Sequence, residues 1–141
     1  MKIVKEKDAN ECDIGDLIDR FICFRIPSID TPIDDVINIL VEDCCEFNRD
    51  NIHTLAEQLR LYDKLTDKYI ELLIRGCFRW YIPELAEQIR LANKLTDKYI
   101  ELLIYSCCRI DIPRLVQQIP DNYKPTKAVI ELLEAKGYKV L

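Results

Sequence analysis

A near-exact internal repeat constrains the fold of this chain more than any other feature of its sequence. Residues 55–74 read LAEQLRLYDKLTDKYIELLI, and residues 85–104, 30 positions later, read LAEQIRLANKLTDKYIELLI, with only three differences. The register continues in both directions, because residues 112–133 match parts of the same unit and residues 32–45 align with residues 65–78. Copies at spacings of about 32, 30 and 30 residues therefore fill most of the chain, the pattern of a repeat protein.

Each copy has the apolar spacing of two helices. In the second helix, Leu65, Tyr69 and Leu72 begin a face that continues for three turns. Thr66 is the expected N-cap of this helix, and Pro83 suits the first turn of the helix that follows. We expect one helical-repeat domain over residues 1–141, with residues 1–12 and 137–141 as caps or tails, and second helices near residues 33–46, 65–78, 95–108 and 125–136.

Helix pairs that cannot bury their apolar faces alone stack side by side. The predicted fold class is therefore all-α, a right-handed α-solenoid of about four stacked helix pairs. The phrases DKYIELLIYSCCRIDIP and AVIELLEAKGYKVL resemble the second helix of ankyrin repeats, although the T-P-L-H-x-A motif is absent. The helix lengths are more similar to those of HEAT-like helix pairs. The resemblance covers roughly residues 13–136, satisfies no single family motif, and implies a stacked helical scaffold.

Charge and motifs narrow the classes of function. With 20 Lys and Arg against 25 Asp and Glu, the net charge of −5 makes nucleic acid an unfavourable partner. The sequence has no glycine-rich phosphate loop, HExxH or GxSxG pattern. We therefore expect no enzyme, no catalytic residue, no metal site and no cofactor.

The N-terminal segment and the lengths of the apolar runs bear on location. The opening sequence MKIVKEKDANECD is charged and lacks the apolar stretch of a signal peptide. No apolar run approaches the ~18 residues that cross a bilayer. We expect a cytoplasmic protein, with the nucleus as the alternative, that is neither secreted nor bound to a membrane.

The cysteines and the single histidine have structural explanations. Cys45, Cys77 and Cys107 are expected to form one column at the ends of the second helices, where small apolar side chains suit close helix packing. The pairs of cysteines required by a common zinc site, spaced as C-x2-C, are absent. His53 lies where the first helix of a unit should begin, so we expect a helix-entry residue rather than a ligand.

Positions where the copies disagree point to a binding surface. Residues 75–81 correspond to residues 105–111, yet Trp80, the only tryptophan, and Tyr81 occur once. Tryptophan, tyrosine and arginine dominate binding hot spots. The predicted partner-binding residues are Arg75, Arg79, Trp80, Tyr81, Tyr105 and Arg109. The alternative for Trp80 is that it fills the core between helix pairs. A recurrent glutamine column has two interpretations: it binds a peptide backbone or, as we favour, it forms an outer polar face. Its members are Gln58, Gln88 and Gln118.

These observations favour a non-catalytic protein–protein interaction module that binds a protein or peptide through an extended surface. The alternatives are a nucleic-acid-binding helical repeat protein and a structural repeat protein that self-assembles. Self-assembly would arise if a terminal repeat lacked a polar cap and stacked end to end on a second copy.

Overall fold

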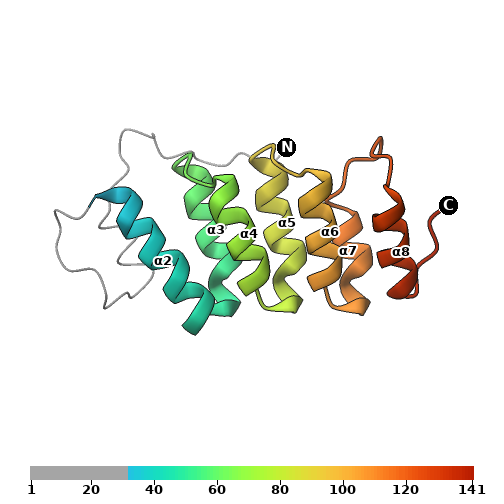
Figure 1. Cartoon of the computed structure of the whole chain (residues 1–141), viewed down its shortest axis with the longest axis horizontal. Helices are drawn as coiled ribbons and strands as arrows, with labels where there is room; N and C mark the ends of the chain where they lie inside the picture. The colour runs from blue at the N-terminus through green and yellow to red at the C-terminus, as the bar shows by residue number, and fades with distance from the viewer. Residues whose placement is uncertain (1–31) are drawn as a thin grey trace.

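The computed structural model describes residues 32–141, and all regular structure in this part of the chain is helical. Figure 1 shows the helices side by side in a row that follows their order in the sequence. Short 3₁₀ turns precede three of the helices: η2 (Arg49–Asn51), η3 (Arg79–Tyr81) and η4 (Arg109–Asp111). The α-helices are α2 (Ile33–Phe47), α3 (Ile52–Leu61), α4 (Asp67–Gly76), α5 (Ile82–Leu91), α6 (Asp97–Ser106), α7 (Ile112–Val116) and α8 (Lys127–Ala135).

The helices pack in two layers. The second helices of the repeats contact one another in the order α2, α4, α6, α8, and the first helices in the order α3, α5, α7. The two layers also contact each other, as α3 contacts α4 and α5 contacts α6. Adjacent helices are therefore packed as in a helical repeat protein.

The core lies between the two layers and repeats with the sequence. Ile52, Ile82 and Ile112 begin the three first helices and are each almost completely buried. Leu73 and Leu103 occupy equivalent buried positions in α4 and α6. Burial of one leucine or isoleucine side chain contributes about 1.5–3 kcal/mol. The shared columns therefore stabilise every junction between units in the same way.

The turns from first to second helices are closed by one hydrogen-bond pattern. After α3, the amide of Lys64 donates to the carbonyl of Leu59 over 2.7 Å, and Asp63 takes a left-handed φ of 57°. After α5, Asn93 adopts a φ of 59° in the same arrangement. This is the Schellman motif, in which the left-handed residue is usually glycine. Gly137, with a φ of 90°, ends α8 in the same way.

Side-chain hydrogen bonds join each repeat to the next. In the first-helix layer, Arg60 donates to Gln88 over 2.8 Å, and 30 residues later Arg90 donates to Gln118 over 3.0 Å. In the second-helix layer, the Tyr99 hydroxyl donates to an Asp67 carboxylate oxygen over 2.9 Å. The side chains of Gln88 and Gln118 therefore bind arginines of the preceding repeat. Gln58, the first member of the glutamine column, is only 6% exposed, so the expected outer polar face does not extend to it.

Two local expectations differ from the structure. Thr66 does occupy the N-cap of α4, but its side chain makes no capping hydrogen bond, whereas Thr126 accepts one from the Val129 amide over 3.2 Å. The cysteine column was assigned wrongly at its first member. Cys44, rather than Cys45, is buried in the position equivalent to Cys77, because α2 aligns with α4 through Leu40 and Leu73.

Candidate functional site

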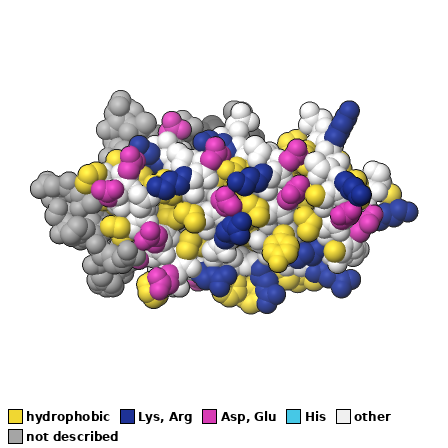
Figure 2. All heavy atoms as spheres, viewed as in Figure 1, with side chains coloured by type: hydrophobic (Ala, Val, Ile, Leu, Met, Phe, Trp, Pro, Cys, Tyr) yellow, Lys and Arg dark blue, Asp and Glu magenta, His cyan; other side chains and the backbone are white. Residues whose placement is uncertain are grey.

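All six predicted partner-binding residues lie at one edge of the helical array. We call this edge, formed by the 3₁₀ turns and the C-terminal ends of the second helices that precede them, the junction edge. Arg75 and Tyr105 lie in the last turns of α4 and α6. Arg79, Trp80 and Tyr81 form η3, and Arg109 begins η4. In Figure 2, dark blue and yellow side chains gather along the lower margin of the molecule, where these junctions lie in Figure 1.

The aromatic side chains of the junction edge are accessible to solvent. Trp80 is 54% exposed and Tyr105 is 71% exposed, so Trp80 does not fill the core between helix pairs. Ile110, 77% exposed, occupies in η4 the position of Trp80 in η3, and Phe47 is 71% exposed at the end of α2. Sequence reasoning missed these last two residues, although the 30-residue period places Ile110 in the column of Trp80.

Ring contacts hold the aromatic side chains of η3 in place. The Trp80 ring lies 5.0 Å from the Phe78 ring, centroid to centroid, at an interplanar angle of 36°. Tyr81 stacks on His53 at 4.5 Å and 14°. His53 is the second residue of α3, as expected for a helix-entry histidine, so this stack joins two successive repeats. Rigid aromatic side chains lose little conformational entropy when they bind a partner.

Three arginines surround a hollow of about 360 Å³ beside η3, which we call the arginine hollow. Arg49 donates from Nε to the Gly76 carbonyl over 2.7 Å and lies 5.7 Å from the centre of the Phe78 ring. Arg75 pairs with Glu71 over 3.1 Å. The full lining is Arg49, Ile74, Arg75, Cys77, Phe78, Arg79 and Ser106. Arg49 was missed from the sequence, although it stands 30 residues before Arg79.

Arg79 differs from Arg49, its counterpart 30 residues earlier, in the partners of its side chain. Arg49 caps the C-terminal end of α4. The guanidinium of Arg109 packs against Gly137, where a Cβ atom would lie 2.9 Å from Nη2 of Arg109. The equivalent end of α6 is occupied by Lys136, whose Nζ donates to the carbonyls of Tyr105 and Cys107 over 3.1 and 2.9 Å. Within residues 32–141, the Arg79 side chain is exposed and makes no ion pair or hydrogen bond.

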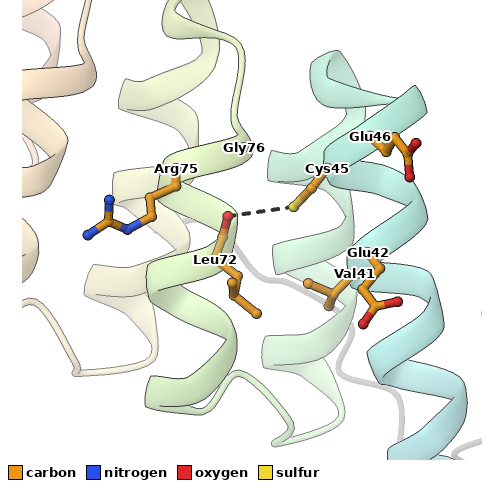
Figure 3. Close-up of a pocket in the computed structure, with 7 residues that line it drawn as sticks. All are labelled: Val41, Glu42, Cys45, Glu46, Leu72, Arg75 and Gly76. Carbon is orange, nitrogen blue, oxygen red and sulfur yellow. Dashed lines mark hydrogen bonds between the residues drawn. The ribbon is translucent and has the colours of Figure 1, made fainter.

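A second hollow, of about 490 Å³, lies between α2 and α4 and shares Arg75 with the arginine hollow. Figure 3 shows Val41 and Leu72 between the two helices, with Arg75 extending away from Cys45 toward the next repeat. The Cys45 thiol donates to the Leu72 carbonyl over 3.5 Å. The remaining lining is Glu42, Glu46 and Gly76.

Thiol chemistry is suppressed in this part of the fold. Burial raises the pKa of the Cys44, Cys77 and Cys107 thiols to about 12. Burial also raises the pKa of Cys45, against an opposing effect of Arg49. A thiolate is the nucleophilic form of cysteine, so the Cys44, Cys77 and Cys107 side chains are protonated and poorly nucleophilic near neutral pH.

The described part of the chain offers no metal-binding cluster and no membrane-spanning helix. In residues 32–141, no group of three or more His, Cys, Asp or Glu side chains could hold a metal ion. In the same residues, no helix is both long and apolar enough to span a bilayer. Comparison of the chain with protein-family models, curated proteins and solved structures finds no match.

Proposed function

We propose that this protein is a non-catalytic interaction module that binds a protein or peptide through its junction edge. The observation that carries the proposal is the exposure of Trp80 and Tyr105 at the same edge as Arg79, whose side chain has no partner among the described residues. The proposal includes the finer architecture expected from the repeats, a right-handed α-solenoid, because stacked repeats present extended binding surfaces.

The side chains of this edge have the properties of binding anchors. Large apolar residues that gather on the surface of a monomer mark interaction sites more often than scattered ones do. Trp80, Tyr105 and Ile110 are each more than half exposed. Tyr105 lies in the last turn of α6, and η3 and η4 hold Trp80 and Ile110 on short, defined turns. Arginine can add bidentate hydrogen bonds to carboxylates of a partner. The edge therefore combines apolar area with a charge that selects acidic groups.

Site-specific photo-cross-linking tests this proposal. A benzophenone amino acid placed at position 80 would report a partner at the junction edge. Placed at position 91, it would report contacts at the opposite end of α5, because Leu91 is also exposed but ends that helix. We expect one protein or peptide from a native extract to cross-link at position 80 and not at position 91.

A matched substitution then measures affinity with the purified partner. Trp80→Asp introduces the residue that the preceding repeat has at this position, Asp50, so the fold should accept it. Loss of a tryptophan anchor costs at least about 2 kcal/mol, roughly 30-fold in affinity. Leu91→Ala serves as the control with unchanged affinity. Equal cross-linking at both positions, or equal affinity of wild type and Trp80→Asp, would refute binding at this edge.

A further inference from the structure

We propose that the arginine hollow receives a doubly negative group presented by the partner: a phosphorylated side chain or two adjacent acidic side chains of a peptide. This inference rests on the proposed function and names the chemistry of its partner. The hollow is lined by Arg49, Arg75 and Arg79, and no carboxylate is part of its lining. Clusters of arginine are the usual means by which proteins recognise phosphorylated and acidic peptide motifs.

The arginines of the hollow carry more positive charge than the carbonyls and carboxylates of the fold neutralise. The C-terminal ends of α4 and α6 bring carbonyl oxygens to this edge, and helix C-termini attract cations. These carbonyls already accept hydrogen bonds from Arg49 and Lys136. One carboxylate oxygen of Glu71 pairs with Arg75, and the other lies 3.0 Å from Nζ of Lys98. The negative charge of Glu71 is therefore divided between two cations. The charge of Arg79 is therefore left for a ligand.

The walls of the hollow strengthen an interaction with an anion. Ile74 and Cys77 are almost completely buried, and Phe78 forms an aromatic side beneath Arg49. The guanidinium groups present planar pairs of donors that match phosphate and carboxylate oxygens. The Ser106 hydroxyl, also in the lining, can donate a further hydrogen bond.

The surroundings of the hollow favour a peptide over a nucleic acid. The adjoining hollow, which shares Arg75, is lined on its α2 side by Glu42 and Glu46. A phosphodiester chain that continued past Arg75 would approach these carboxylates. A peptide carries its negative charge at one or two side chains and can place apolar side chains elsewhere along the edge. The net charge of −5 also disfavours a nucleic acid, because it repels a phosphodiester chain.

Trp80 provides a direct optical test, because it is the only tryptophan of the chain and lies 5.0 Å from Phe78, which lines the hollow. We would titrate the full chain with two acetylated tripeptides, Gly-phosphoserine-Gly and Gly-Glu-Glu, and follow Trp80 fluorescence at constant ionic strength. Unphosphorylated Gly-Ser-Gly is the blank. We expect a saturable change with at least one charged peptide; the one that binds more tightly identifies the form of the anion.

Two charge-matched variants locate the binding. Arg79→Gln should weaken binding by about tenfold or more, because a hydrogen bond to a charged group contributes about 1.5–3 kcal/mol. Lys68→Gln removes the same charge from the first turn of α4, about 10 Å along the helix from Arg75, and should leave binding unchanged. Circular dichroism of both variants confirms that each retains the helical fold.

Several outcomes would overturn the assignment of the hollow. They are no saturable response to either charged peptide, equal weakening by Arg79→Gln and Lys68→Gln, and tighter binding of a short oligothymidylate than of either peptide. A partner that still cross-links at position 80 while the charged peptides fail to bind would refute the arginine hollow alone. Loss of that cross-link as well would refute binding at the junction edge.

Discussion

Replacing Asp63 with glycine should make the protein more stable, although it deletes a charged side chain. Asp63 has a φ of 57° in the turn after α3, where the Schellman motif requires a left-handed residue. The left-handed region costs an L-residue about 1–2 kcal/mol, and glycine avoids that cost. Glycine loses about 0.5–1 kcal/mol through the greater freedom of the unfolded chain. The net gain in the free energy of unfolding is therefore about 0–1.5 kcal/mol, with a midpoint near 0.75 kcal/mol.

The exposed side chain of Asp63 makes no ion pair within residues 32–141, so little is lost when it is removed. Urea unfolding followed by circular dichroism at 222 nm gives the change in free energy, and the thermal midpoint should rise by about 3 °C. Asp63→Ala is the matched control, because it retains the Cβ and should not gain stability. An Asp63→Gly protein no more stable than Asp63→Ala would refute the reasoning from backbone conformation. Asn93→Gly should show the same sign with a smaller gain, since asparagine tolerates this conformation best after glycine.

Other parts of the fold give three further predictions. Gly76→Ala should destabilise the protein by about 1–2 kcal/mol in urea unfolding, because the added Cβ would lie 2.7 Å from the Cys45 Sγ; Cys45→Ala in the same chain should restore part of the loss. Iodoacetamide at pH 8, read by peptide mass spectrometry, should modify Cys45 faster than the three buried thiols, and equal rates would contradict their protection. Burial and a hydrogen bond to Asp67 raise the pKa of Tyr99 to about 12 from 10. Its contribution to stability is complete below pH 10 and is lost as the pH rises through 12, so Tyr99→Phe should reduce the fall in stability over this range.

The duplicated sequence was sufficient to predict the helix pairs but not all of their lengths. Leu85 and Leu115 occupy the same buried column, as the register required. However, α7 ends at Val116, whereas α5 continues to Leu91. The third copy has Pro120 where the second has Arg90, and proline cannot continue a helix and also restricts the residue before it. The similarity of the copies therefore obscured a difference in helix length that Pro120 alone causes.

The candidate site was predictable as a set of residues but not as a surface. The disagreement between copies identified Trp80, but the sequence could not decide between a buried and an exposed side chain. That decision depends on η3, a 3₁₀ turn with three residues per turn, which directs Trp80 outward before α5 begins. The role of Arg49 depends on its distance to the Gly76 carbonyl at the end of α4, in the next repeat, and such contacts between repeats have no signature within one copy.

The two arginine–glutamine hydrogen bonds, from Arg60 to Gln88 and from Arg90 to Gln118, have a consequence for how such a chain can change in length. Each bond takes its donor from one copy and its acceptor from the following copy. A 30-residue segment added or removed in register would leave every donor facing an acceptor of the same kind, whereas a change that is not a whole number of such segments would separate them. The protein can thus be shortened or extended by whole units, and its reach toward a partner can be altered in steps without a new core having to be formed.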